Sequence, residues 1–477
     1  SLFLFNCGGS GGGSGLVSNI VGPPGSIDLP VPTCSDSGSS SIKTNEYHGI
    51  GGGNSNHGLG RVCASAAYER GATGSGIKVA VVDTGMPFFI SGSTARNYHH
   101  AFGGYNAELD SNKLVLPANS DYVNGDDIPD DGSCLFNSCH GLHVAGIIGA
   151  KKDDEAGNWM DTIGMHGIAY DSTLYIFKGL TDYGGSDATL GNSMNGAINA
   201  GVDIINNSWG SDSQIGVDCT SASSCEAAIG STIYSAMEAA GTRATPIINV
   251  FAAGNDGYDQ PSIEAGAMIY DDDFKNTQLA VVAVGTDGKI ASYSNKCGLA
   301  ANYCIAAPGS AINAPGSFWA YTYTTKNGTS MAAPMVSGGL ALIMQEFSSL
   351  TPAQVVNRLF VTALDTEEYS QSSIYGHGLM NLNSATQPLG NLQTFQGSNN
   401  LNNNDSQFSN LNENQITSSN FINKNILNKL KGNYIEVYDS YDQANFKVDL
   451  SQFVLSKPAY TDNATYNSLE AARLGVK

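Results

Sequence analysis

Asn327-Gly328-Thr329-Ser330-Met331-Ala332-Ala333-Pro334 is a small-residue turn that leads into an apolar run, residues 335–344. The apolar run predicts a buried helix. Ser330 should then lie at a helix N-terminus, where free N–H groups and the helix dipole favour a developing negative charge. We place Pro334 in the first helical turn, where its missing N–H costs little. A serine in this position suggests a nucleophile, which needs a base and a group that orients the base.

Candidates for both groups lie upstream of this turn. Residues 77–82 form a mostly apolar, β-branched run that predicts a strand buried in a parallel sheet. Asp83 follows at the carboxyl end of that strand, the edge at which open α/β sheets build their sites. His140 opens a second apolar segment, which predicts a helix. The chain order Asp83, His140, Ser330 differs from that of chymotrypsin and the α/β-hydrolases and matches that of subtilisin.

Five segments in this order resemble the subtilisin-like serine proteases. Three surround the candidate triad: Asp83-Thr84-Gly85, His140-Gly141-Leu142-His143-Val144-Ala145-Gly146 and Gly328-Thr329-Ser330-Met331-Ala332-Ala333-Pro334. Asn207-Ser208-Trp209-Gly210 resembles the substrate-binding segment of the family, and Ala252-Ala253-Gly254-Asn255 resembles its oxyanion segment. The resemblance covers roughly residues 50–385. Leu142 stands where the family usually has Thr, which we interpret as a change in helix packing.

The resemblance implies acyl-transfer chemistry. Ser330 attacks the peptide carbonyl, His140 transfers the proton, and Asp83 orients the imidazole and stabilises the imidazolium. The side-chain amide of Asn255 and the backbone N–H of Ser330 are the candidate oxyanion donors. Candidate substrate-binding residues are Ser208, Trp209, Gly210, Ala252, Ala253 and Gly254. Ser208 to Gly210 would offer backbone to an extended substrate by strand addition, and Trp209 itself is either a substrate contact or a packed residue.

The pattern of apolar residues predicts alternating strands and helices. Strands are expected at residues 174–178, 202–206, 247–252 and 279–284, and helices at 190–198 and 227–240. A further helix should begin at Thr351-Pro352, with a cap residue followed by proline. This alternation predicts an α/β fold with a mostly parallel central sheet and helices on both faces, as in the three-layer subtilisin-like fold.

Changes in composition divide the chain into three parts. Residues 1–45 are a Gly/Ser-rich tether that is too short and too polar to be a folded inhibitory prosegment. Residues 46–385 form the catalytic domain. Residues 386–477 combine an Asn-rich linker, including Asn402-Asn403-Asn404, with expected strands at 433–437, 446–450 and 453–455. This extension resembles the stem of a bacterial autotransporter passenger, and a disordered tail is the alternative.

Nine cysteines indicate an oxidising compartment. Disulfides are favoured over zinc because no converging Cys/His set appears, and the expected pairs are Cys134/Cys139, Cys219/Cys225, Cys297/Cys304 and Cys34/Cys63. Cys7 is left over. It follows a short apolar segment and precedes a flexible stretch, which resembles a bacterial lipoprotein processing site. Asn6 is not the small residue usual before a lipidated cysteine, so Cys7 is either lipidated or free.

The net charge of −21 over 477 residues argues against electrostatic binding of nucleic acid or anionic membrane. No apolar run of about 20 residues is present to form a transmembrane helix. The acidic residues at 124–132 and 271–273 are either calcium ligands or solvated turn acids, and the spacing favours the latter. We expect His143 to be a helix-packing residue. His99, His100 and His166 lack partners at metal spacing, so we expect no metal site.

The sequence thus predicts a serine endopeptidase that hydrolyses extended polypeptides without a cofactor. It would be secreted or held at the surface of a Gram-negative bacterium, with outer-membrane association through a lipidated Cys7 or through a C-terminal barrel that this sequence does not contain. The alternative is an adhesin or binding passenger that uses the protease fold as a scaffold.

Overall fold

The structure is a computed structural model of the chain. It describes residues 36, 38–39, 41–48, 58–87, 89–91, 95–97, 99–102, 113–125, 129, 139–152, 164–316, 323–390, 392–396, 407–410 and 434–449. Several expectations fall outside these residues: Cys7, Cys34, Cys134, most of the tether, most of the acidic stretch 124–132, Asn402–Asn404 and the strand at 453–455.

The chain divides into two compact units. The described residues of the first unit lie within Pro32–Glu346 and Thr351–Thr386, and those of the second lie within Phe347–Leu350 and Gln387–Lys477. We describe each unit by itself.

A seven-stranded sheet forms the centre of the first unit, with the strand order β4-β5-β1-β6-β7-β8-β9. Every neighbouring pair is parallel. The strands are β1 (Lys78–Asp83), β4 (Leu114–Val115), β5 (Thr173–Lys178), β6 (Ile204–Asn207), β7 (Ile248–Ala252), β8 (Gln278–Val284) and β9 (Cys304–Pro308). Runs of buried β-branched and small residues explain this arrangement, because parallel strands are covered on both faces.

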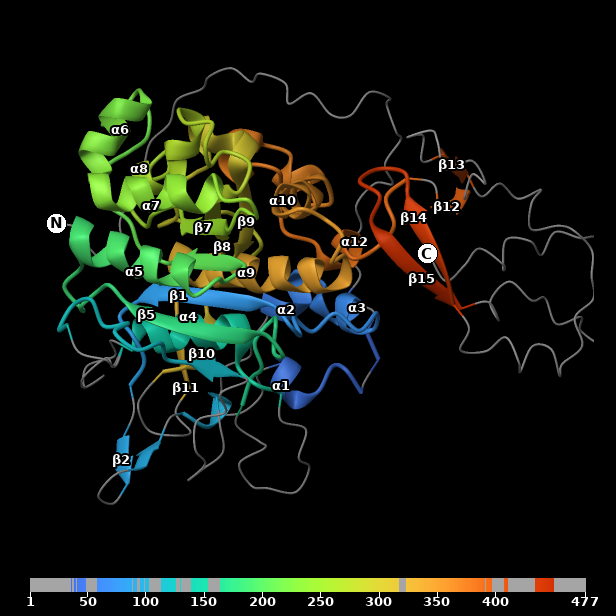
Figure 1. Cartoon of the computed structure of the whole chain (residues 1–477), viewed down its shortest axis with the longest axis horizontal. Coiled ribbons are helices and arrows are strands. Elements are labelled where there is room, and N and C mark those ends of the chain that lie inside the picture. The colour runs from blue at the N-terminus through green and yellow to red at the C-terminus, as the bar shows by residue number, and fades with distance from the viewer. Residues whose placement is uncertain are drawn as a thin grey trace, which may run out of the picture. The chain divides into compact units, whose positions relative to one another are not determined.

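Helices cover both faces of the sheet (Figure 1). One face carries α5 (Asp187–Asn199), α7 (Ser231–Gly241) and α8 (Ile263–Gly266), and the other carries α4 (His140–Gly149) and α9 (Thr329–Glu346). The three-layer α/β fold predicted from the sequence is therefore confirmed. The remaining helices of this unit are α1 (Asn45–His48), α2 (Gly58–Arg61), α3 (Ala64–Tyr68), α6 (Ala222–Ile229), α10 (Pro352–Val361), α11 (Ser372–Tyr375) and α12 (Leu382–Ala385).

Shorter elements complete the first unit. Two antiparallel pairs lie outside the main sheet, β2 (Phe89–Ser91) with β3 (Ala95–Asn97) and β10 (Ile312–Pro315) with β11 (Tyr323–Lys326). The 3₁₀ turns are η1 (His100–Phe102), η3 (Ala267–Ile269), η4 (Gly298–Tyr303) and η5 (Glu367–Tyr369).

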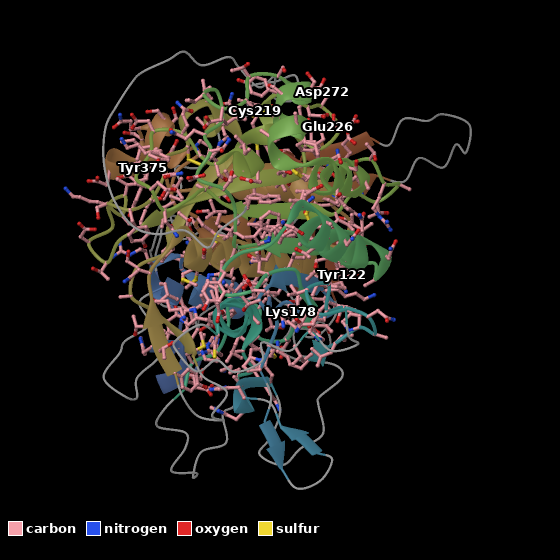
Figure 2. The ribbon with its side chains drawn as sticks, turned by 90° about the vertical axis from the view of Figure 1, so that its left-hand side faces the viewer. Tyr122, Lys178, Cys219, Glu226, Asp272 and Tyr375 are labelled. Atoms are coloured by element: carbon pink, nitrogen blue, oxygen red, sulfur yellow. A yellow bond between two sulfur atoms is a disulfide. The ribbon has the colours of Figure 1, made fainter. Side chains whose placement is uncertain are left out.

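The carboxyl ends of the central strands meet at one edge of the sheet. Asp83 ends β1, and the segments that begin at Ser208 and Ala253 follow β6 and β7 directly. Tyr122 extends this edge beside β5, since its N–H donates to the Lys178 carbonyl oxygen over 2.9 Å (Figure 2). The Lys178 ammonium also forms a buried ion pair with Asp121 at 3.4 Å. Asp83 and the segments that begin at Ser208 and Ala253 are far apart in sequence and lie at the same edge of the sheet.

One expected helix is broken in two. The sequence predicts a single helix over 227–240, but α6 ends at Ile229 and α7 begins at Ser231. Gly230 between them has φ +113°, a conformation that residues with a Cβ rarely adopt. The Asp187 carboxylate then caps α7, accepting from the Ile233 N–H at 2.8 Å and from the Thr232 hydroxyl at 2.8 Å. The prediction was wrong because the apolar spacing continues across the break.

The position of Pro334 also differs from the prediction. Helix α9 begins at Thr329, so Pro334 lies inside it and not in its first turn. Its missing N–H leaves the carbonyl of Ser330, four residues earlier, without its helical partner. The Ser208 hydroxyl donates to that carbonyl oxygen over 3.0 Å. A side chain from the end of β6 therefore replaces the hydrogen bond that proline removes.

The second unit contains an antiparallel sheet with the order β13-β12-β14-β15. Its strands are β12 (Leu392–Gln396), β13 (Gln407–Asn410), β14 (Tyr434–Asp439) and β15 (Asn445–Asp449). The sequence predicts β14 and β15 to within a residue or two. It misses β12 and β13, because they lie in polar, low-complexity sequence whose side chains give no alternating apolar pattern.

Replacing Gly230 with alanine should test the break between α6 and α7. A Cβ at this position would lie 2.5 Å from Asp187 Cγ, and the backbone conformation is strained for any side chain. We expect Gly230→Ala to lower the free energy of unfolding by about 2–4 kcal/mol. Gly201→Ala is the control, because Gly201 has φ +66° with no atom within 4 Å of the added Cβ, and should cost about 1–2 kcal/mol. Equal urea midpoints for the two variants would contradict the expectation.

Candidate active site

Asp83 and His140 are in direct contact at the edge of the sheet. His140 Nδ1 lies 2.8 Å from Asp83 Oδ1, and the two side chains are 13% and 1% exposed. His140 is the first residue of α4, and Gly141 makes the close approach possible. A Cβ at Gly141 would lie 2.4 Å from the Gly85 carbonyl oxygen and 3.3 Å from Asp83 Cβ. The glycine therefore lets the start of α4 rest on the end of β1.

Thr84 fixes both partners of this contact. Its backbone N–H donates to Asp83 Oδ1 over 2.7 Å, and its hydroxyl oxygen accepts from the Gly141 N–H over 3.0 Å. Asp83 Oδ2 is buried with no hydrogen-bond partner in the described part of the structure. The carboxylate is thus held in one orientation, with Oδ1 directed at the imidazole. Sequence reasoning gave Thr84 no role, although it stands within the Asp83-Thr84-Gly85 motif.

Ser330 is the second residue of α9, and the whole residue is 4% exposed. Its hydroxyl donates to the Ser208 carbonyl oxygen over 3.0 Å. Since a serine hydroxyl has one proton, it does not donate to His140 in this arrangement. Catalytic hydrogen bonds of free enzymes are often loose or misdirected, and rotation about Cα–Cβ redirects the hydroxyl.

A short network orients Asn255. Its side-chain Oδ1 accepts from the Thr329 N–H at 2.8 Å and from the Thr329 hydroxyl at 2.9 Å. The Thr329 hydroxyl oxygen accepts in turn from the Gly254 N–H at 3.2 Å. With Oδ1 occupied, the Asn255 Nδ2 donors point away from Thr329, and Nδ2 lies 3.3 Å from the place where a Cβ on Gly328 would be. Thr329, immediately before Ser330, thereby aligns the amide.

Asn295 holds the chain around the segment Ala252–Asn255 through three hydrogen bonds. Sequence reasoning gave this residue no role. Its Nδ2 donates to the Ala253 carbonyl oxygen over 3.0 Å, and its Oδ1 accepts from the N–H groups of Asp256 and Tyr258, each at 3.0 Å. Gly254 has φ +113°, and a Cβ there would lie 2.3 Å from Asn295 Nδ2. Nothing in the sequence signalled this role, because Asn295 stands in a polar stretch where asparagine is a common turn residue.

The remaining predicted substrate-binding residues lie where β6 and β7 end. Ser208, Ala252, Ala253 and Gly254 are buried at the edge of the sheet. Trp209 is fully buried, and its ring packs edge-on against Phe251 with centroids 5.4 Å apart. Of the two alternatives left open for Trp209, the structure favours the packed residue.

Three further histidines of the described chain take packing positions. His143 is fully buried in α4, and its Nε2 contacts the Thr324 carbonyl oxygen at 3.1 Å. His166 is buried among tyrosine rings, and His99 packs edge-on against Tyr323. Among the described residues, no group of three or more His, Cys, Asp or Glu side chains is arranged to hold a metal ion.

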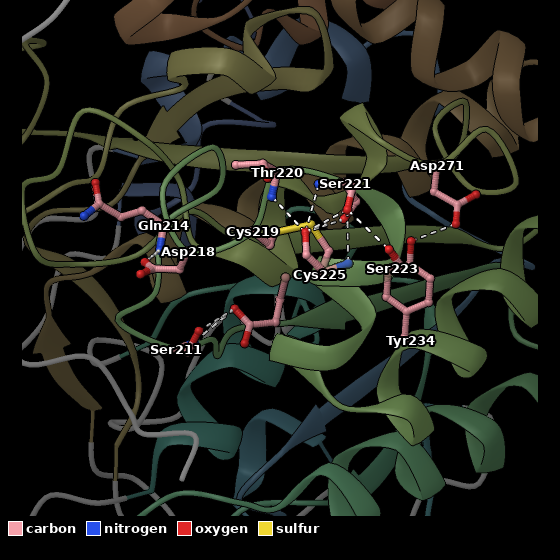
Figure 3. Close-up of a disulfide and its surroundings, with 12 residues drawn as sticks. Ser211, Gln214, Asp218, Cys219, Thr220, Ser221, Ser223, Cys225, Tyr234 and Asp271 are labelled. Atoms are coloured by element: carbon pink, nitrogen blue, oxygen red, sulfur yellow. Dashed lines mark hydrogen bonds between the residues drawn. A yellow bond between two sulfur atoms is a disulfide. The ribbon is translucent and has the colours of Figure 1, made fainter.

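Two of the expected disulfides are present in full, Cys219–Cys225 (Figure 3) and Cys297–Cys304. Cys63 and Cys139 are also disulfide-bonded, while their expected partners lie outside the described residues. The acids at 271–273 have local partners: Asp271 accepts from the Tyr234 hydroxyl at 2.8 Å, and Asp272 pairs with Lys275 at 2.5 Å. Within the described part of the chain, no helix has the length and apolarity needed to cross a bilayer.

An Asp–His contact and a helix-terminal serine, placed at the edge of a parallel sheet, define the class of α/β serine hydrolases. The comparison with family models gives the family. Residues 74–378 match the model of the subtilase family, so the chain belongs to that family, and it is a serine-type endopeptidase.

Individual relatives agree with this assignment. Subtilisin Savinase from Lederbergia lenta is 32% identical over 330 residues, which cover 69% of this chain and 97% of that protein. An alkaline protease from Shouchella clausii is 32% identical over 69% of each chain. An extracellular serine protease from Serratia marcescens is 30% identical over 69% of this chain and 33% of its own length.

His143 should make stability depend on pH. Burial, and then the charge of Lys326, lower the pKa of His143 to about 3. The unfolded chain, with a histidine pKa near 6.5, binds more protons below that pH, so stability is full above it and falls as the pH drops toward 3, by up to about 1.4 kcal/mol per pH unit. His143→Gln keeps a donor for Thr324 and should flatten this slope in urea unfolding measured between pH 4 and 7. An unchanged slope would assign the acid sensitivity to other groups.

Proposed function

We propose that Asp83, His140 and Ser330 form the catalytic triad of this endopeptidase. The observation that carries the proposal is the contact of 2.8 Å between His140 Nδ1 and Asp83 Oδ1, with Ser330 at the N-terminus of a buried helix. The carboxylate fixes the imidazole tautomer in which Nδ1 carries the proton, which leaves Nε2 as the base.

The reaction then follows from the chain's own groups. The Ser330 hydroxyl turns from the Ser208 carbonyl to His140 Nε2, gives up its proton and bonds to the substrate carbonyl carbon. Asn255 Nδ2 and the Ser330 N–H donate to the oxyanion. His140 passes the proton to the departing amine nitrogen, which leaves an ester on Ser330. A water molecule, deprotonated by His140, attacks this ester and releases the acid product and the serine.

The substrate is a polypeptide, which we propose binds extended along Ser208, Trp209 and Gly210. A substrate that binds as an added strand forms hydrogen bonds through its backbone. The site would therefore accept peptides of many sequences. The chemistry needs no cofactor. The buried indole of Trp209 limits this segment to backbone recognition.

We propose an extracytoplasmic location for this chain. Its disulfides favour an oxidising compartment, and one relative is named an extracellular protease. The antiparallel sheet of the second unit agrees with the stem of an autotransporter passenger at a Gram-negative surface. The same proposal includes lipidation of Cys7, which would attach the chain to the outer membrane.

Covalent labelling separates the enzyme from an adhesin that keeps the fold as a scaffold. A fluorophosphonate should label the wild-type protein at Ser330, and Ser330→Ala should show neither labelling nor peptide hydrolysis. Ser235→Ala is the control and should still be labelled, because this serine is exposed on α7 and is not part of the hydrogen-bond network around Ser330. A wild-type protein that reacts no faster than Ser330→Ala would support the scaffold.

Asn255→Asp tests the oxyanion donor. The substitution keeps an oxygen for the Thr329 donors and replaces the Nδ2 donors with a second oxygen. We expect kcat to fall by about 10²–10³ with little change in KM, because the amide acts mainly on charge that develops in the transition state. Steady-state kinetics on a peptide anilide measure this, with thermal unfolding as the check on folding. A loss confined to KM would remove Asn255 from the oxyanion site.

A further inference from the structure

Glu264 is a fully buried carboxyl residue that the catalytic mechanism does not use. It is the second residue of α8, two positions after the Ser262 N-cap. Burial raises the pKa of its carboxyl, and hydrogen bonds from Ser211 oppose that shift. A buried acid is costly unless its bonds compensate, so the partners of Glu264 indicate what it holds.

The partner of the Glu264 carboxylate is Ser211, the residue that follows the substrate-binding segment Ser208–Gly210. Glu264 Oε2 accepts from both the backbone N–H and the hydroxyl of Ser211, each at 3.1 Å (Figure 3). Two donors that converge on one oxygen fix the direction of the Ser211 chain more closely than a single hydrogen bond does. The end of the substrate-binding segment is thus fastened to α8 by a two-donor contact.

Backbone bonds continue this attachment. The Ile263 N–H donates to the Ser213 carbonyl oxygen over 3.0 Å, and the Ile215 N–H donates to the Pro261 carbonyl oxygen over 3.1 Å. Residues 211–215 therefore run beside residues 261–263. The Cys219–Cys225 disulfide closes the loop that follows (Figure 3).

The same short segment also touches the oxyanion side of the site. The Ser262 N–H donates to the Ala253 carbonyl oxygen over 2.9 Å. The Gln278 side chain, from β8, donates to the Glu264 carbonyl oxygen over 2.9 Å and so holds α8 on the sheet. Residues 261–264 thus contact both the chain that leaves Ser208–Gly210 and the chain that leads to Asn255.

We infer that Glu264 is a positioning residue that sets the spacing between the substrate-binding segment Ser208–Gly210 and the oxyanion segment Ala252–Asn255. It acts through Ser211 and does not touch the substrate. Its effect falls on extended peptides, because they lie along Ser208–Gly210, whereas a small ester needs only the triad and the oxyanion donors. This inference rests on the proposed function of the same site.

The experiment compares two substrates in Glu264→Gln. One is a tetrapeptide anilide that occupies the segment, and the other is p-nitrophenyl acetate. Replacing the carboxyl group with an amide keeps the shape and puts an NH2 group, which does not accept, in place of one of the two oxygens. We expect KM for the peptide to rise about tenfold, with kcat/KM for the ester changed less than twofold. Glu264→Ala should act in the same direction and more strongly, and Glu264→Gln carries the test if the alanine variant does not fold.

Asp187→Asn is the matched control. The Asp187 carboxylate also accepts from a backbone N–H and a hydroxyl, those of Thr232, but these belong to the start of α7 and not to the chain that leaves Ser208–Gly210. It should lower the thermal stability and leave the ratio of peptide to ester kcat/KM at its wild-type value. Ser211→Ala should shift the ratio less than Glu264→Gln, and the double variant should not exceed the sum of the two effects.

Three outcomes would overturn the inference. Equal losses on peptide and ester in Glu264→Gln would show a general structural effect, as would a loss of stability with the ratio unchanged. A shift of the ratio in Asp187→Asn as large as that in Glu264→Gln would remove the specific role of the segment. A wild-type protein inert toward both substrates and toward fluorophosphonate would instead refute the proposed function itself, and this inference with it.

Discussion

The site depends on a reciprocal pair of hydrogen bonds between Ser208 and Ser330. The Ser208 hydroxyl donates to the Ser330 carbonyl oxygen, and the Ser330 hydroxyl donates to the Ser208 carbonyl oxygen, each over 3.0 Å. The first bond exists because Pro334 supplies no N–H to that carbonyl. The carbonyl group that lacks a helical partner in α9 therefore attaches this helix to the end of β6. Asn206 extends the attachment, since it donates to the Ser208 hydroxyl oxygen and accepts from Ser337, which lies about two helical turns beyond Ser330.

The sequence predicted the fold because parallel strands leave a strong local signal. Buried β-branched runs such as residues 79–82 and 279–284 have few other interpretations between helical patterns. The candidate triad residues were found for a related reason, since each stands at the end of such a run or at the start of a helix. The contact between Asp83 and His140 required more than a pattern. It depends on Gly141 resting on the Gly85 backbone, a fit visible only once both chain segments are in place.

What the sequence did not reveal is mostly the polar layer behind the site. Thr84, Asn295, Thr329 and Glu264 act through hydrogen bonds to residues distant in sequence or to neighbouring backbone. Threonine and asparagine are common in turns and glutamate is common on the surface, so residue type alone gives these four positions no role. The break at Gly230 was missed for the opposite reason, because the apolar spacing on both sides is regular and the constraint comes from the Asp187 cap.

This polar layer explains how a site made largely of backbone groups keeps its geometry. A backbone N–H group has no side-chain torsion of its own, so its direction is set by the backbone conformation of the residues on either side. At the oxyanion segment, Asn295 and Thr329 fix the chain around Gly254, whose φ of +113° no other residue adopts easily. At the substrate-binding segment, Glu264 does the same for the chain that leaves Gly210. Donors held in this way need little reorganisation when charge develops, and this is the condition under which hydrogen bonds lower a reaction barrier rather than merely bind the substrate. In the proposed mechanism, the determinants of rate therefore lie in these buried hydrogen bonds as well as in Asp83, His140 and Ser330.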